Sequence, residues 1–364
     1  MPVLPRILLR ILAFCAACGA PADAARRPDP PVRAARPAGP PRLDSAALAD
    51  VYARASRLPK LRSLLVQLRD TLVAERYYGG ATATRPANLK SASKSVVSAL
   101  LGAAIAERHV PGLDATLADA LPRDARALDS AKRAITLEDL VTMRSGLEST
   151  SIYNYGAWVS SRDWIRYALA RPLVAPPGHD GGPMIYSTGN SHLLAAVLTR
   201  ATGQSLYAYY ARTLARPLGI VPRPWPTDPR GVYFGGNDMR MTPREALRFG
   251  ALYLHGGVAP PGTPAAGRRL LARAWIDSSW VPRTRSSFSG EDYGYGWWMR
   301  DAVGARGMHR VYYAWGYGGQ FVYVVPSLSL VVVATSDPDA PERDHGHLNA
   351  VHALLDAVVR AAGG

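Results

Sequence analysis

The chain has 364 residues, of which 48% are hydrophobic, and a formal net charge of +15 at pH 7. This length and composition suffice for a large core and two subdomains. Residues 1–42 hold seven arginines against two acidic residues, and the remaining positive charge is scattered among acidic side chains without a dense basic stripe, so the composition does not indicate nucleic-acid binding.

Residues 1–24 are typical of a secretion signal peptide. A basic start is followed by a short apolar run at 11–17, and Ala22-Asp23-Ala24 offers an Ala-x-Ala cleavage site. The apolar run is too short to span a bilayer. We therefore expect an exported protein, periplasmic or secreted, with a lipid anchor on Cys18 left open by the spacing of Cys15 and Cys18.

Residues 25–43 are predicted to be a linker. Residues 26–42 hold six prolines and five arginines and lack core-forming side chains. Both cysteines of the chain lie in the leader, so no internal disulfide is expected despite an oxidising destination. We expect one folded domain over residues 44–362, with a helical subdomain at about 110–290.

Strands are predicted at both ends of this domain. Residues 61–67 and 71–78 form one hairpin around a turn at Arg69-Asp70, and residues 320–325 and 328–335 form another around Pro326-Ser327. A last amphipathic helix is expected around residues 348–359.

Helical signals dominate between these ends. They predict a long apolar helix at 91–107, a helix opened by Thr136 and ended by Gly146, a helix at 193–201 stopped by Gly203, a helix begun by Ser205, and one opened by Thr242-Pro243-Arg244-Glu245. This order implies an α/β (α+β) fold in which the two termini supply one sheet and a helical subdomain is inserted between them.

Ser91 and Lys94 form the most informative pair. The chain has four lysines, and Lys94 stands three residues after Ser91 at the start of the long apolar helix, where positions i and i+3 share a face. A desolvated lysine can act as a base, and burial and the helix N-terminus both lower its pKa. This segment alone leaves open that Ser91 merely caps the helix.

Two further segments carry candidate chemistry. Tyr186 stands just before a helix start among small polar residues, where its hydroxyl could relay a proton or simply pack in a loop. Residues 314–320 are rich in glycine, which either lets a backbone N–H approach a ligand as part of an oxyanion hole or marks a bulged strand.

Together these three segments resemble the class C β-lactamase and penicillin-binding-protein-like superfamily of serine hydrolases, over about residues 45–362. Residues 135–147 and 235–245 resemble the same superfamily, and the esterase and 6-aminohexanoate-dimer-hydrolase branch is the nearest in character. The resemblance implies an antiparallel sheet flanked by helices plus an all-helical subdomain, with the site in the cleft between them.

The resemblance also implies roles for individual residues. Ser91 would be the nucleophile, Lys94 its base and Tyr186 the proton shuttle to the leaving group, while the backbone N–H groups of Ser91 and Tyr317 would form the oxyanion hole. The substrate would be a small-molecule ester, amide or peptide-like compound, cleaved through an acyl-serine intermediate. The scheme requires neither a metal nor a cofactor.

The sequence departs from the superfamily pattern at two places. The second motif is commonly Tyr-x-Asn, but here the third position is Thr188, with Asn190 two residues later. The strand motif is commonly Lys/His-Thr-Gly, but here it is Ala314-Trp315-Gly316, which lacks the cation that holds a substrate carboxylate. Unless His309 or Arg310 restores that cation, a neutral apolar substrate fits better than a β-lactam. The residues expected to contact substrate are Thr188, Asn190, Ala314, Trp315 and Gly316.

Other functions stay open. One is β-lactamase or D-alanyl-D-alanine peptidase activity. Another is a non-catalytic envelope binding module, which the altered motifs favour and the intact Ser91, Lys94 and Tyr186 argue against. Asp344, His345, His347 and His352 could suggest a metal site, but their place before the last helix favours a solvated cap.

Overall fold

The computed structural model describes residues 43–340 and 346–362, which belong to one compact unit. The predicted signal peptide, almost all of the predicted linker and Cys18 lie outside the described residues. Within the described part, no helix has both the length and the apolar character needed to cross a membrane.

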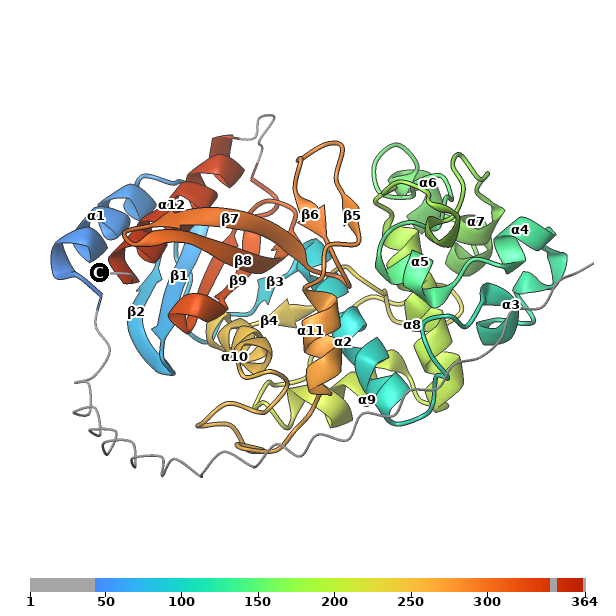
Figure 1. Ribbon diagram of the computed structural model, residues 1–364, viewed down its shortest axis with the longest axis horizontal. Helices are drawn as coiled ribbons and strands as arrows, with labels where there is room; N and C mark the ends of the chain where they lie inside the picture. Colours follow the sequence, from blue (N-terminus) through green and yellow to red (C-terminus); the bar gives the residue numbers. More distant parts are fainter. Residues whose placement is uncertain (1–42, 341–345, 363–364) are drawn as a thin grey trace, which may run out of the picture. The chain divides into compact units, whose positions relative to one another are not determined.

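An antiparallel sheet of eight strands forms the larger layer, in the order β2-β1-β10-β9-β8-β7-β6-β5 (Figure 1). Its strands are β1 (Leu61–Leu68), β2 (Thr71–Tyr77), β5 (Thr284–Arg285), β6 (Asp292–Tyr293), β7 (Trp298–Gly304), β8 (Gly307–Gly316), β9 (Gln320–Val325) and β10 (Leu330–Ser336). The first and last strands of the chain, β1 and β10, pair side by side. This arrangement confirms the predicted fold class.

Both predicted hairpins are present. Arg69 and Asp70, between β1 and β2, adopt left-handed backbone angles (φ 45° and 63°), as a two-residue hairpin turn requires. Between β9 and β10 the chain makes a 3-10 turn at Pro326–Leu328 and passes through Ser329 at φ 52°. Leu328 therefore lies in the turn rather than in the strand, which begins at Leu330.

The sheet is covered on both faces, so that its central strands are buried. Helices α1 (Ser45–Ser56) and α12 (Gly346–Ala362) pack together on one face, and α10 (Pro243–Leu254) packs on the other (Figure 1). Alternate residues of β10 enter the two cores, with Val332 in the core beneath α12 and Val331 and Val333 in the core beneath α10. Burial on both faces explains why the sequence of β10 is a continuous apolar run instead of an alternating one.

The remaining helices gather on the far side of β5 and β6 from α1 and α12 (Figure 1). They are α3 (Leu117–Ala120), α4 (Ser130–Arg133), α5 (Leu137–Val141), α6 (Tyr155–Val159), α7 (Trp164–Ala170), α8 (Thr188–Thr202) and α9 (Leu206–Tyr210), while α2 (Ser93–Ala106) contacts both α8 and β8 and α11 (Arg273–Ser279) lies beside α2. A two-stranded sheet of β3 (Ala87–Asn88) and β4 (Arg240–Met241) brings residues before α2 next to those before α10. The helix α2 is thus held between the sheet and the helical region.

The helix boundaries partly match the predictions. The capping boxes at Thr136 and Thr242 are formed, and Gly203 ends α8 in a left-handed conformation. The helix after Thr136 ends at Val141, however, and not at Gly146, because the chain turns through Met143 at φ 62°. The helix predicted at 193–201 begins earlier, at Thr188, and Ser187 is its N-cap residue.

Candidate active site

Ser91 lies in a 3-10 turn, Lys90–Ala92, directly before α2. Lys90 is held at φ 47°, and its backbone N–H donates to Asn88 Oδ1 at 2.9 Å. The prediction placed Ser91 at or just before the first turn of the helix. The turn places Ser91 in the lining of a cavity and leaves Lys94 in the first turn of α2.

Lys94 reaches Ser91 across this turn, with Nζ 3.0 Å from Ser91 Oγ. The amine has two other partners, Thr188 Oγ1 at 3.2 Å and the Gly236 carbonyl oxygen at 2.8 Å. A neutral amine has two N–H groups and one lone pair. If the N–H groups donate to Thr188 and Gly236, the lone pair is left facing the Ser91 hydroxyl, which is the arrangement a general base needs.

Burial lowers the pKa of the Lys94 amine to about 7, against a smaller opposing effect of the Asp238 carboxylate. The side chain is only 4% exposed, and a charged ammonium is disfavoured there because it loses its hydration. Near neutral pH a large fraction of Lys94 is therefore uncharged and able to accept a proton.

The pKa of Tyr186 is shifted in the opposite direction from that of Lys94. Burial raises the pKa of its phenol to about 12, and a hydrogen bond with Ser91 only partly offsets this. Its ring lies 5.1 Å from Lys94 Nζ. A phenol that stays protonated at neutral pH can donate a proton to a leaving group, whereas Lys94 is the group able to accept one.

Thr188, which stands where the superfamily's second motif commonly has asparagine, contacts Lys94. Its hydroxyl lies between Lys94 Nζ and Ser151 Oγ, at 2.9 Å from the latter, and its backbone N–H donates to Ser151 Oγ. Asn190, in contrast, is buried, and its Oδ1 accepts from Ser145 Oγ at 3.0 Å. Thr188 lines the cavity and Asn190 does not, because the helical turn between them points Asn190 into the protein.

The strand motif brings the backbone of β8 against the turn that carries Ser91. A side chain at Gly316 would lie 2.0 Å from the Leu89 carbonyl oxygen, so only glycine permits this approach. Tyr317 follows directly, and its N–H forms no hydrogen bond with any described residue. Ala314 is buried away from the cavity, while Trp315 lines it. Of the three motif residues expected to contact substrate, Trp315 alone lines the cavity.

The cavity has a volume of about 760 Å³ and mostly apolar walls. Aromatic side chains that the sequence analysis did not identify contribute to it, among them Phe288 and Trp298, whose rings lie 6.2 and 5.2 Å from Trp315. Ser151, Tyr155, Asn237 and Gly236 were also missed. Only Gly236 and Asn237 carried a signal, since they lie within residues 235–245 that resemble the superfamily.

Among the described residues, no cation that lines the cavity is free to replace the missing one. The amine of Lys90, which lines the cavity, lies 3.4 Å from Asp238 Oδ1. Arg310 pairs with Asp292 and Asp301, and His309 contacts Ser327, so neither restores the charge.

The two described histidines of this group lie within α12 and not before it, and they are part of the packed structure. His347 is buried with Nε2 2.9 Å from Ser336 Oγ, and His352 lies beside Tyr323 and Arg300. Burial, with Arg300 nearby, lowers the pKa of His352 to about 3. The predicted solvated cap is therefore wrong for these two residues; Asp344 and His345 lie outside the described residues.

The chain matches the model of the family described as Beta-lactamase over residues 63–357. It is 27% identical over 343 residues to the 6-aminohexanoate-dimer hydrolase of Paenarthrobacter ureafaciens, covering 84% of this chain and 82% of that protein. Similar solved structures include a protein from Bacillus anthracis described as a 6-aminohexanoate-dimer hydrolase (TM-score 0.68, 21% identity, 82% of this chain and 79% of that one). A family VIII carboxylesterase is also similar (TM-score 0.63, 15% identity, 86% of this chain and 97% of that one).

Proposed function

Because the chain belongs to the beta-lactamase family of hydrolases, we propose that it is an exported serine hydrolase that cleaves an ester or amide through an acyl-serine intermediate. The observation that carries this proposal is the contact of Lys94 Nζ with Ser91 Oγ at 3.0 Å, with both N–H groups of the amine given acceptors elsewhere. The proposal of export rests on residues 1–24 alone.

In the first half of the proposed reaction, Lys94 takes the Ser91 proton as Oγ attacks the substrate carbonyl. The N–H groups of Ser91 and Tyr317 stabilise the resulting oxyanion. As the carbonyl re-forms, the bond to the leaving group breaks, and that group takes the Tyr186 proton, which the Lys94 ammonium replaces. In the second half, water attacks the acyl-serine, its proton returns through the same two side chains, and Ser91 leaves with its hydroxyl restored.

The cavity supports a neutral substrate with an apolar group. Trp315, Trp298 and Phe288 supply flat apolar surface beside Ser91, and the Lys90 amine is already opposite a carboxylate. A substrate carboxylate would have to compete with Asp238 for that amine. Neutral esters and amides are therefore favoured over β-lactams, which carry a carboxylate.

A substrate panel tests this preference. We expect kcat/KM for p-nitrophenyl butyrate to exceed that for nitrocefin by roughly 100-fold or more, because the nitrocefin carboxylate would have to compete with Asp238 for the Lys90 amine. A 100-fold preference corresponds to about 2.7 kcal/mol of transition-state binding. We expect Trp315→Ala to raise KM for the butyrate with little change in kcat. Nitrocefin turnover equal to or above ester turnover would instead indicate a β-lactamase, and labelling by a fluorescent penicillin would indicate a D-alanyl-D-alanine peptidase.

Tyr186→Phe tests the proposed proton donor. Alkoxide and amine leaving groups need a proton, whereas p-nitrophenolate does not. We expect kcat for an alkyl ester or an amide to fall by about 10²-fold or more, the range typical of general acid catalysis, and kcat for p-nitrophenyl butyrate to fall much less. An equal loss on both substrates would show that Tyr186 acts on another step.

A further inference from the structure

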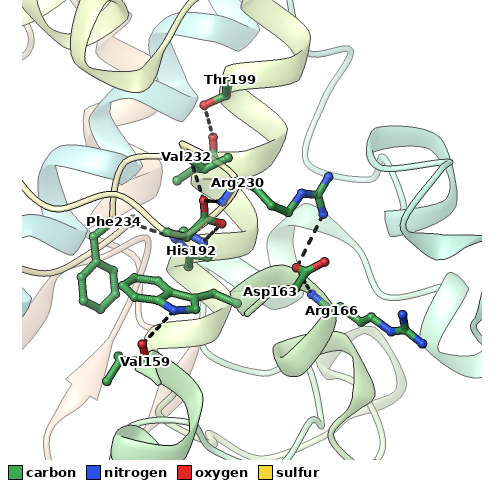
Figure 2. A network of polar contacts seen from close by, with 12 residues as sticks. Val159, Asp163, Arg166, His192, Thr199, Arg230, Val232 and Phe234 are labelled. Carbon is green, nitrogen blue, oxygen red and sulfur yellow. Dashed lines mark hydrogen bonds and ion pairs between the residues drawn. The ribbon is translucent and has the colours of Figure 1, made fainter. Parts of the chain in front are cut away.

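A buried histidine–carboxylate pair lies behind the candidate site, in α8 and the segment before β4. His192 Nε2 is 3.0 Å from Asp228 Oδ2, and both side chains are fully shielded from solvent. The ring is surrounded by Trp158, Trp164 and Phe234. Figure 2 shows His192 between Phe234 and the turn that carries Arg230 and Val232.

The hydrogen bonds fix which nitrogen of His192 carries the proton. Nδ1 faces the Gly235 backbone N–H at 3.3 Å, and because an N–H can only donate, Nδ1 must accept. The ring proton therefore lies on Nε2 and is donated to Asp228. The other carboxylate oxygen of Asp228 accepts from the N–H groups of Arg230 and Val232, each at 2.8 Å.

This pair is connected to the reactive amine through two adjacent residues, Gly235 and Gly236. Gly235 precedes Gly236, whose carbonyl oxygen accepts from Lys94 Nζ at 2.8 Å. The glycine pair fits tightly: a side chain at Gly235 would lie 2.3 Å from the Ser191 carbonyl oxygen, and one at Gly236 would lie 2.8 Å from Lys94 Cγ. A small shift of Gly235 would therefore move the acceptor that orients the amine.

We propose that His192 and Asp228 are positioning residues, which hold the Gly235-Gly236 backbone so that the Gly236 carbonyl keeps one N–H of Lys94 turned away from Ser91. Their chemistry suits this task, since a buried neutral imidazole with a fixed proton offers a rigid acceptor to Gly235. As far as it concerns catalysis, this inference rests on the function proposed above.

The carboxylate is well suited to fix the tautomer. Burial alone would raise the pKa of the Asp228 carboxyl, but the hydrogen bonds from His192 and from the Val232 and Arg230 backbone outweigh it and keep the pKa below its ordinary value. Asp228 thus stays ionised and can only accept, which keeps the proton on Nε2.

Asp228→Asn tests the proposal with almost no change of shape. The asparagine oxygen must still accept from Arg230 and Val232, so its NH₂ group faces His192 Nε2. The ring then has to carry its proton on Nδ1, where it opposes the Gly235 N–H. We expect kcat/KM for p-nitrophenyl butyrate to fall by about 10- to 100-fold, as small displacements of reacting groups do, with KM little changed.

A second readout does not depend on activity. The chain has only four lysines, so the Lys94 signal can be followed by NMR in protein labelled at lysine. Loss of the Gly236 acceptor removes a hydrogen bond to the ammonium, so we expect the titration of Lys94 to move to lower pH in Asp228→Asn, and the acid limb of the pH–rate profile with it. The other titratable groups that face Lys94, the Tyr186 phenol and the Asp238 carboxylate, are unchanged.

Asp163→Asn is the matched control. Asp163 caps α7 by accepting from the Arg166 N–H and lies 3.7 Å from Arg230 (Figure 2). The substitution therefore removes one carboxylate charge near Arg230, as Asp228→Asn does, without changing a contact of His192. We expect it to leave both readouts unchanged. His192→Asn, which can place an oxygen where Nδ1 accepts from Gly235, should retain more activity than Asp228→Asn.

The outcomes separate this inference from the proposed function. An unshifted Lys94 titration in folded Asp228→Asn, or more activity in Asp228→Asn than in His192→Asn, would overturn the positioning role. If the wild type hydrolyses no ester or amide, the proposed function fails, while the NMR titration still decides whether the pair positions Lys94.

Discussion

Ser91→Ala is expected to lower kcat for p-nitrophenyl butyrate by about 10⁴-fold or more, to the level of the uncatalysed reaction plus what binding alone supplies. The physical reason is that Ser91 Oγ lies 3.0 Å from the Lys94 amine, whereas Thr188 Oγ1, the other cavity hydroxyl that contacts this amine among the described residues, is a secondary alcohol also bonded to Ser151. The substitution removes one oxygen from the cavity lining and leaves the packing of α2 intact, so the thermal unfolding midpoint should change little. KM cannot be measured if turnover is lost, and substrate binding should then be followed by inhibition or calorimetry.

The matched control is Ser289→Ala, at an exposed serine in the loop between β5 and β6. It should hydrolyse the ester at the wild-type rate. Undiminished hydrolysis by purified Ser91→Ala would contradict the assignment of Ser91 as nucleophile.

Lys94→Arg should lose about 10²- to 10⁴-fold in kcat, the range attributed to a general base, although it keeps the charge. Arginine remains protonated in proteins and cannot accept the Ser91 proton. Lys94→Met, which has a similar length and no charge, should lose as much. If Lys94→Arg keeps most of the activity, the amine acts through its charge and is not the base.

The same residue sets the expected pH dependence. The pKa of Lys94 lies at about 7, below its ordinary value of 10.5, so the amine is neutral and competent above about pH 7 and protonated below it. In wild type, kcat/KM should therefore fall as the pH drops through 7, by about tenfold per unit below pH 6.

Lys94 should also make stability depend on pH. Its pKa is depressed on folding, so between about pH 7 and 10.5 the unfolded chain binds more protons than the folded one, and stability rises with pH. Below pH 7 both states are protonated and the cost of the buried ammonium is present in full. We therefore expect Lys94→Met to unfold at a higher temperature than wild type at pH 6, as often occurs when a catalytic group is removed.

The sequence allowed accurate predictions where the signal is local. The hairpin turn at Arg69-Asp70 and the capping boxes at Thr136 and Thr242 depend on neighbouring residues, and all are formed. The proximity of Ser91 and Lys94 is equally local, because it needs only one helical turn. The family resemblance was predicted from three short segments and is confirmed by the match over residues 63–357.

What could not be predicted depends on contacts between distant segments. The Gly236 carbonyl reaches Lys94 from 142 residues away, and nothing in either segment encodes that distance. Thr188 looked like the loss of a motif residue, yet its hydroxyl contacts Lys94 because Ser151, from a loop 37 residues earlier, bonds to it. Asn190 is among the residues expected to contact substrate, and its spacing alone could not show that the helix begins at Thr188 and turns Asn190 inward.

The most direct test of the proposed acyl-serine chemistry is covalent labelling. Wild-type protein is treated with a fluorophosphonate and cleaved with chymotrypsin, which should leave Ser91 on a peptide spanning residues 90–100, whereas trypsin would leave only residues 91–94. We predict one adduct per chain, on Ser91, forming faster as the pH rises through about 7 and absent in Ser91→Ala. The absence of an adduct, or an adduct on another residue, would contradict the proposed mechanism and favour a non-catalytic binding protein or a different nucleophile.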